Sequence, residues 1–181
     1  DPTAVIGGKL PIIGGSGRAG QSEIMVCEAC EFSDHYQHIA PGYAVVLNVD
    51  ADHLDYFGSL ENIIASFRRF ASKASKAIIA NLDDANTMKA VEGLPVRVIT
   101  FGQTMEADYY PENIQVSEGR TSYDLMHGGE KLTEVVLNIP GVHNVSNSLA
   151  AAAACFEQGV TPAEFARELE GFHGAKRRFE I

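Results

Sequence analysis

The feature that most constrains the fold is a series of four short apolar segments, each bounded by turn residues. They are Ile24–Glu28, Tyr43–Val49, Lys76–Ala80 and Val96–Phe101, and all are rich in Val and Ile. Short strands that are apolar on both faces are typical of a parallel sheet covered by helices on both sides. The sequence therefore predicts an α/β fold with a mainly parallel sheet flanked by helices.

A helical stripe lies between the second and third segments. Apolar residues recur at helical spacing from Leu60 to Ala71, and Ser59 stands where an N-cap is needed. A helix between two strands predicts a β-α-β crossover, which is right-handed by default.

The pattern changes after residue 101. Ile114–Val116, Thr121–Met126 and Leu132–Ile139 have the composition of strands, and Gly128–Gly129 between the last two suits a tight hairpin. We expect a small antiparallel β-sheet in this part of the chain.

Two helices are predicted near the C-terminal end. The first is the alanine-rich segment Val145–Phe156, which Gly159 ends. The second begins with the capping box Thr161–Glu164, has Pro162 at its first position, and runs to about Glu170.

Composition narrows the class of protein. The 181 residues are 45% hydrophobic, which suits one domain with one substantial core, and no repeat or linker divides them. A formal net charge of -10 argues against nucleic-acid partners and anionic membrane surfaces. No apolar run approaches the roughly 20 residues that span a bilayer. We expect a soluble, cytoplasmic protein without membrane contacts.

The segment Gly15–Gly20 matches the dinucleotide fingerprint G-x-G-x-x-G, and with Gln21 and Ser22 it approaches a phosphate-binding loop that lacks its lysine. Both motifs need a helix directly afterwards, whereas the predicted strand Ile24–Glu28 follows here. We expect a plain glycine-rich loop and leave contact with a substrate open.

Cys27 and Cys30 form a C-x-x-C motif. A redox pair and a zinc site are both conceivable, but zinc needs more ligands and only Cys155 remains. Ordinary burial of the thiols is the favoured interpretation.

Acidic groups follow the first two predicted strands. Glu28 and Glu31 end the first, and Asn48–Asp55, which includes His53, follows the second. We expect these two strands to be neighbours, so that the groups meet at the edge where open α/β sheets bind ligands. Mg²⁺ needs only one or two protein groups beside substrate phosphates. Histidine is an uncommon Mg²⁺ ligand, so composition leaves His53 open between ligand, acid-base and structural roles.

Asn144 and Asn147 stand three residues apart at a predicted helix start, so they share a face. An amide complements the N7 and amino edge of adenine. The alternative is N-capping by Asn144 or Ser146.

In this order the motifs resemble those of the Mur ligase family. The resemblance spans essentially the whole chain, and the strand-end Glu, the D-H-x-D, the H-N-x-x-N and the terminal R-R-F-E make it specific. Its motifs are Asp1-Pro2-Thr3 with Gly7-Gly8, Glu28–Glu31, Asn48–Asp55, Asn81–Asp84, His143-Asn144 with Asn147, and Arg177–Glu180.

The resemblance implies a set of site residues. Glu28 and His53 would coordinate a catalytic Mg²⁺, and Arg178 would reach the ATP phosphates, which makes these three the catalytic residues. Asn144 and Asn147, with His143, would bind the adenine end of ATP. The family's chemistry is phosphorylation of a carboxylate, followed by attack of an amine on the acyl phosphate. Positioning and charge neutralisation supply most of such catalysis.

Within the family, the resemblance points to the addition of L-alanine to UDP-N-acetylmuramate in peptidoglycan synthesis, and hence to cell wall biogenesis, cell shape and cell division. Cys30 stands where many members have Asp, which indicates a variant subgroup and removes the reason for a redox pair. Ser16-Gly17 replaces a common Asn-Ala pair, which argues against substrate contacts by that loop.

Alternatives remain within and outside the family. They are a murein-peptide or folyl-polyglutamate ligase, a metal-dependent phosphohydrolase built on Glu28 and Asp50–Asp55, and a non-catalytic nucleotide-binding module.

The resemblance also implies that residues 1–181 are a central ATP-binding domain without its P-loop segment, which would precede Asp1. The UDP-binding and amino-acid-binding domains would lie outside this stretch. We expect the fragment alone to be inactive, and its oligomeric state is open.

Overall fold

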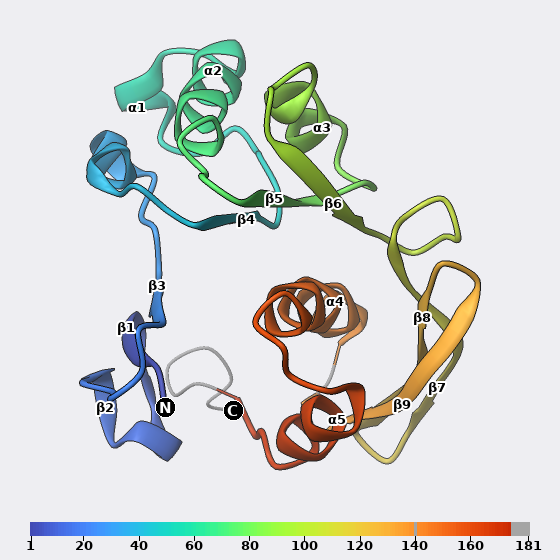
Figure 1. Ribbon diagram of the computed structural model, residues 1–181. Coiled ribbons are helices and arrows are strands. Elements are labelled where there is room, and N and C mark those ends of the chain that lie inside the picture. Colours follow the sequence, from blue (N-terminus) through green and yellow to red (C-terminus); the bar gives the residue numbers. More distant parts are fainter. Residues whose placement is uncertain (140, 175–181) are drawn as a thin grey trace. The chain divides into compact units, whose positions relative to one another are not determined.

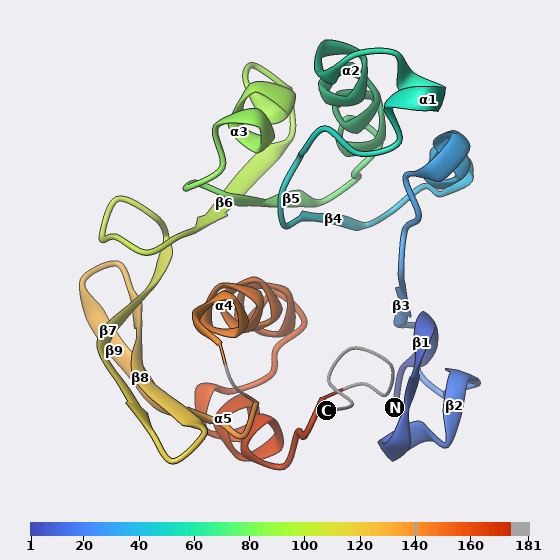
Figure 2. The same cartoon turned by 180° about the vertical axis from the view of Figure 1, so that it is seen from behind.

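The computed structural model describes residues 1–139 and 141–174 (Figures 1 and 2). Contacts group the chain into two compact units. The larger unit is Glu31–Phe172, and the smaller one comprises Asp1–Cys30 and the segment that begins at His173. The sequence shows no linker at this boundary. Among the described residues, no helix has both the length and the apolar character needed to cross a membrane.

A six-stranded sheet forms the larger unit, with its strands in the order in which they occur along the chain. The first three pairs of neighbours are parallel, and the last two are antiparallel. This confirms the predicted fold class. The strands are β4 (Tyr43–Val46), β5 (Ala77–Asn81), β6 (Arg97–Phe101), β7 (Tyr109–Ser117), β8 (Arg120–His127) and β9 (Glu130–Leu137).

Helices cover both faces of this sheet (Figures 1 and 2). On one face lie α1 (Leu54–Phe57), α2 (Leu60–Ala71) and α3 (Ala85–Val91), and on the other lie α4 (Val142–Phe156) and α5 (Pro162–Glu170). Ile78 and Ile79 of β5 are therefore both fully buried, although their side chains point to opposite faces. The prediction of doubly covered strands is confirmed for β5.

The helix starts in the larger unit follow the capping residues in the sequence. The Ser59 side chain accepts a hydrogen bond from the amide of Asn62 and begins α2, as predicted. Thr161 and Glu164 form the predicted capping box of α5. The short helix α3, which Asp84 caps through the amide of Thr87, was not predicted.

The hairpin at Gly128–Gly129 is also present, with positive φ angles of 58° and 85° that suit glycine. Its strands do not form a separate sheet. Because Phe101 of β6 pairs with Tyr109 of β7, the antiparallel strands extend the parallel sheet.

A three-stranded sheet forms the smaller unit, in the order β2-β1-β3. It consists of β1 (Thr3–Leu10), β2 (Gly15–Arg18) and β3 (Met25–Cys27), with a 3-10 turn at Pro11–Ile13. The segment Ile24–Glu28 thus forms a strand, but the expectation that it is buried is wrong, since Met25 and Val26 are 58% and 54% exposed. No α-helix among the described residues of this unit covers the sheet.

The glycine-rich segment does not form the expected loop. Gly15–Arg18 is the strand β2, antiparallel to β1, and β3 rather than a helix follows it. Gly20 instead permits a close backbone approach, because a Cβ there would lie 2.2 Å from the carbonyl oxygen of Asp1. That carbonyl accepts the amides of Gln21 and Ser22, each at 3.0 Å. The segment closes a turn within the smaller unit.

Cys27 and Cys30 are both exposed, so the interpretation as buried thiols is wrong. The physical reason for Cys27 is that its strand, β3, has no covering helix among the described residues of this unit.

Candidate functional site

The chain that leaves β4 is held by polar side chains from the end of β5, from the N-cap of α3 and from the first turn of α3. The Asn81 amide donates to the carbonyl of Leu47 at 2.9 Å, and Asn86 donates to the carbonyl of Val49 at 3.0 Å. A carboxylate oxygen of Asp84 accepts the amide of Val49 at 3.1 Å. The Asn81–Asp84 motif therefore fixes the start of the segment that carries His53.

His53 stands directly before α1 with left-handed backbone angles, φ 53° and ψ 38°. This conformation is uncommon outside glycine and costs free energy unless neighbouring groups hold it. Three bonds do so: the His53 amide donates to the Asp52 carboxylate at 2.7 Å, and the His53 carbonyl accepts the amides of Tyr56 at 2.9 Å and Phe57 at 3.0 Å.

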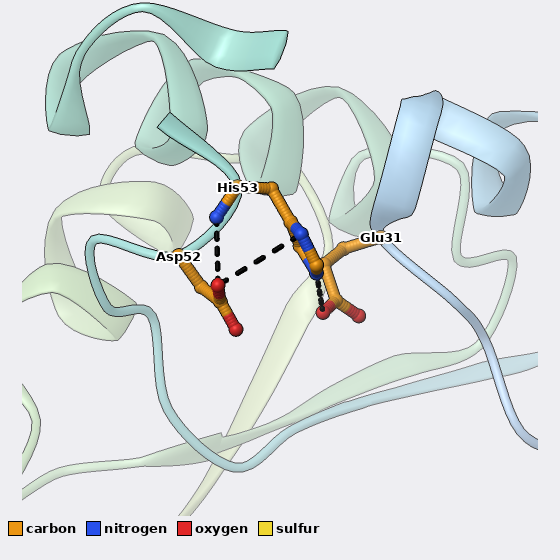
Figure 3. Close-up of side chains that lie close together, drawn as sticks. All are labelled: Glu31, Asp52 and His53. Carbon is orange, nitrogen blue, oxygen red and sulfur yellow. Dashed lines mark hydrogen bonds and ion pairs between the residues drawn. The ribbon is translucent and has the colours of Figure 1, made fainter. Parts of the chain in front are cut away.

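Two carboxylates lie beside the imidazole of His53 (Figure 3). The Nε2 atom of His53 is 3.5 Å from an oxygen of Glu31, and its Nδ1 atom is 3.8 Å from an oxygen of Asp52. One ligand atom from each residue lies within 4.8 Å of the others. The ring of Phe32 packs against the imidazole with its centroid at 5.0 Å and an interplanar angle of 65°.

This donor set fits a hard divalent cation. Carboxylate oxygens are ligands that Mg²⁺ takes in proteins, and Glu31 and Asp52 supply them at partly or fully exposed positions. Imidazole is a less usual ligand for this ion. We define Glu31, Asp52 and His53 as the His53 cluster.

Glu28 lies in the smaller unit, directly after β3. Its carboxylate accepts the amide of Gly7 at 2.6 Å, and its own amide donates to the carbonyl of Val5 at 2.8 Å. A Cβ on Gly7 would lie 3.1 Å from both carboxylate oxygens, so glycine permits this close approach.

The expectation that the strands before Glu28 and before His53 are neighbours in one sheet is wrong. In the described residues β3 pairs with β1, whereas β4 pairs with β5 in the other sheet. Within the larger unit the glutamate beside His53 is Glu31, which sequence reasoning did not name as a site residue. Its position three residues after Glu28, in the same acidic motif, was the available signal.

The asparagine motif lies in the first turns of α4. The helix begins at Val142 after Gly141, so N-capping by Asn144 or Ser146 is wrong. Asn144 is only 6% exposed, while Asn147 is exposed and its amide lies 3.5 Å from the Asn144 side-chain oxygen, which confirms the shared face.

His143 is exposed and packs against the backbone of Gly141. A Cβ on Gly141 would lie 2.5 Å from Cε1 of the imidazole, and its φ of 105° also requires glycine. Glycine at position 141 therefore permits this placement of the His143 ring at the start of the helix.

The family model for the Mur ligase middle domain matches residues 15–155. The chain belongs to the Mur ligase family. The match covers β2 to α4, so the segments that carry Glu28, His53 and the asparagine motif all lie within the family's middle domain. The resemblance that the motifs indicated is confirmed.

Among relatives of this Mur ligase domain is a UDP-N-acetylmuramate–L-alanine ligase of Caldanaerobacter subterraneus subsp. tengcongensis, 40% identical over 184 residues, covering 100% of this chain and 40% of that protein. The ligase of the same name from Alkaliphilus metalliredigens is 39% identical, with the same coverage. The UDP-N-acetylmuramate-alanine ligase structure from Thermotoga maritima superimposes with a TM-score of 0.85 at 27% identity, covering 99% of this chain and 40% of that one. The chain spans about 40% of the length of these relatives.

Arg178, with the terminal Arg177–Glu180 motif of the Mur ligase resemblance, lies outside the described residues. Its assignment to the ATP phosphates stays a prediction.

Proposed function

We propose that this chain is the central, ATP-handling domain of a ligase that joins L-alanine to UDP-N-acetylmuramate in peptidoglycan synthesis. The observation that supports this most is the 40% identity, across the whole chain, with a UDP-N-acetylmuramate–L-alanine ligase. The reaction would proceed by ATP-dependent phosphorylation of the muramoyl carboxylate and attack of the alanine amine on the acyl phosphate. Phosphate would leave as the amide bond forms.

Glu28 and His53 are the proposed ligands of a catalytic Mg²⁺, and Glu31 and Asp52 adjoin His53. The carboxylates and the imidazole of the His53 cluster form a donor set that fits such an ion. When bound, the ion would neutralise charge on the ATP phosphates. The protein's own contribution is to hold these groups in place through Asp84, Asn86 and the backbone of His53.

The asparagine motif is the proposed adenine site. Asn144 and Asn147 present amides on one face of α4, and His143 stands beside them, exposed. Amides pair with the N7 and amino edge of adenine through one donor and one acceptor. Arg178 is proposed to contact the phosphates and to act with Glu28 and His53 in catalysis.

The remaining parts of the reaction belong to the full-length protein. We propose that it supplies a P-loop before Asp1, a UDP-binding domain and an amino-acid-binding domain, since relatives are about two and a half times as long as this chain. The chain alone is then inactive. A cytoplasmic place fits this role in cell wall biogenesis, cell shape and cell division, without nucleic-acid or membrane partners.

The proposal is tested with the full-length protein. Phosphate release is measured with ATP, Mg²⁺ and UDP-N-acetylmuramate, and with L-alanine, glycine, L-serine or no amino acid. We expect turnover that depends on L-alanine. Absence of such turnover would overturn the assignment, and preference for a murein peptide or for a folate substrate would replace it with the corresponding family ligase.

A matched pair of histidine variants tests the site. His53→Ala is expected to reduce kcat/KM by roughly 100-fold or more, because it removes a group that aligns charge at the reacting phosphate. His38→Ala removes an exposed histidine of the same unit and is expected to retain activity. Equal activity of the two variants would contradict the role of His53. Metal-dependent hydrolysis of a model phosphoester by the chain alone, without ATP, would favour a phosphohydrolase.

A further inference from the structure

Two residues that closely follow Glu31, the first member of the His53 cluster, have an unusual backbone. Ser33 and Asp34, within the 3-10 segment Phe32–His38, have positive φ angles of 53° and 59°. Each such non-glycine residue costs free energy, on the order of 1 kcal/mol or more, unless surrounding contacts hold it. Two in succession therefore need strong support from their side chains or neighbours.

The Asp34 carboxylate supplies that support by contacting two helices. One of its oxygens accepts the hydroxyl of Ser66 in α2. The other accepts the hydroxyl of Tyr56 in α1 at 3.4 Å and pairs with the guanidinium of Arg69 at 3.5 Å. A single side chain thus joins the 3-10 segment to α1 and to α2.

The hydroxyl of Ser66 is buried and its hydrogen-bonding capacity is used in full. It donates to Asp34 and lies 2.9 Å from the Tyr36 hydroxyl and 3.2 Å from the side-chain amide nitrogen of Gln37. A hydroxyl offers one donor and two acceptor positions, which these three contacts match. Burial raises the pKa of Tyr36 to about 12, so its hydroxyl stays neutral at physiological pH.

These contacts connect Asp34 to both segments that form the His53 cluster. Glu31 and Phe32, which contact the His53 ring, precede Asp34 by three and two residues. Tyr56 follows His53 by three residues, and its amide donates to the carbonyl of His53 at 2.9 Å. The segment that bears the glutamate and the segment that bears the imidazole are therefore joined through Asp34.

We propose that Asp34 is a positioning residue that holds Glu31 and Phe32 against the ring of His53 and thereby orders the metal-binding groups of the ligase. The expected effect of Asp34 on catalysis rests on the proposed function. Asp34 itself contacts none of the reacting groups in this role. Its contribution is the geometry of the 3.5 Å approach between Glu31 and His53.

The experiment compares full-length variants in two measurements. Mn²⁺ binding is followed by electron paramagnetic resonance with a non-hydrolysable ATP analogue present, and activity is measured against Mg²⁺ concentration. Groups that orient metal ligands typically change affinity or activity by about 10- to 100-fold when removed. For Asp34→Ala we expect Mn²⁺ affinity to fall roughly tenfold and half-saturation by Mg²⁺ to rise by a similar factor, with kcat at saturating Mg²⁺ changed less than about threefold.

Conservative variants separate positioning from folding. Asp34→Asn keeps an acceptor for Ser66 and is expected to restore part of the lost affinity. Tyr56→Phe removes one hydroxyl, leaves the ring in place, and is expected to weaken Mn²⁺ binding by about threefold, which corresponds to one hydrogen bond. Glu92→Ala removes an exposed carboxylate elsewhere in the larger unit and is the control for lost charge.

Wild-type Mn²⁺ affinity in folded Asp34→Ala and Asp34→Asn proteins would overturn the proposal, as would a wild type that binds no Mn²⁺. A fall in kcat with no change in either metal constant would also contradict it. If the affinity falls as expected but the wild type shows no L-alanine-dependent turnover, the positioning role stands and the proposed function fails.

Discussion

The two units contain similar apolar strands, but the burial of these strands differs. In the larger unit Ile78 and Ile79 of β5 are fully buried because helices cover both faces of the sheet. In the smaller unit Met25 and Val26 of β3 are more than half exposed. A short apolar run therefore predicts a strand, whereas the burial of that strand depends on which helices pack on its sheet.

The largest expected difference between the units is the response to truncation of an apolar side chain. Leu125→Ala in β8 is expected to lower the free energy of unfolding by about 4 kcal/mol, because Leu125 is fully buried and a cavity remains. Met25→Ala removes a side chain of similar volume at a 58% exposed position and should cost less than about 0.5 kcal/mol. Urea denaturation measures both, and similar losses for the two variants would contradict the difference in burial between β8 and β3.

Alkaline pH should destabilise the larger unit selectively, since residues 1–30 contain no tyrosine. Burial raises the pKa of Tyr123 to about 12, from 10.0. Because the folded pKa is the higher one, this stabilisation is complete below pH 10 and is lost as the pH rises towards 12. At about 1.4 kcal/mol per pH unit between these two pKa values, the full loss of stability is roughly 3 kcal/mol. Tyr123→Phe should reduce the alkaline loss in urea denaturation at pH 9 to 11.5, whereas Tyr56→Phe, at a 48% exposed residue, should keep it.

Around Gly7 the smaller unit is closely packed, in contrast to its exposed strand β3. Gly7→Ala places a Cβ 3.1 Å from the Glu28 carboxylate and should displace it, at a cost of about 1.5 kcal/mol. Gly17→Ala, whose Cβ would meet only the Ala4 carbonyl at an ordinary 3.6 Å, should be neutral or slightly stabilising. Thermal unfolding of the two variants measures the difference, and equal effects would show that the Glu28 contact is unimportant for stability.

The smallest effect expected is a gain in the larger unit. The Thr87 hydroxyl in α3 is buried and has no hydrogen-bond partner among the residues that the structure describes. Thr87→Val replaces it with a methyl group of similar shape and should raise the free energy of unfolding by about 1 kcal/mol. A loss of stability in urea denaturation would show that this hydroxyl is hydrogen-bonded in solution.

Elements with a strong local signal could be predicted from the sequence. The helices α2 and α5 follow from apolar spacing and from the capping residues Ser59 and Thr161, and the hairpin follows from Gly128–Gly129. The helix α3 was missed because its seven residues are too few for a clear period. Its cap, Asp84, was present in the sequence as a signal.

Contacts that depend on unusual backbone geometry could not be predicted. Glu31, which lies 3.5 Å from His53, is closely followed by Ser33 and Asp34 with left-handed backbone angles, and no periodic pattern in the sequence predicts such a backbone. The exposure of β3 depends on which segments cover it, and periodicity carries no information on this. Strand β2 was not predicted, because glycine lowers the strand signal of Gly15–Arg18. Strand β1 was not predicted either.

The six strands of the larger sheet lie in the same order in space as along the chain, from β4 to β9. Each new strand can therefore add beside its predecessor while the polypeptide emerges from the ribosome, without waiting for a distant partner. Pairing between consecutive elements keeps contacts local, which favours rapid folding. The helices α4 and α5 follow all six strands along the chain, so the face that buries Leu125 and Val135 stays open until these two helices are made. If translation is arrested before residue 142, the sheet should keep an uncovered apolar face, and chaperones should bind to that face.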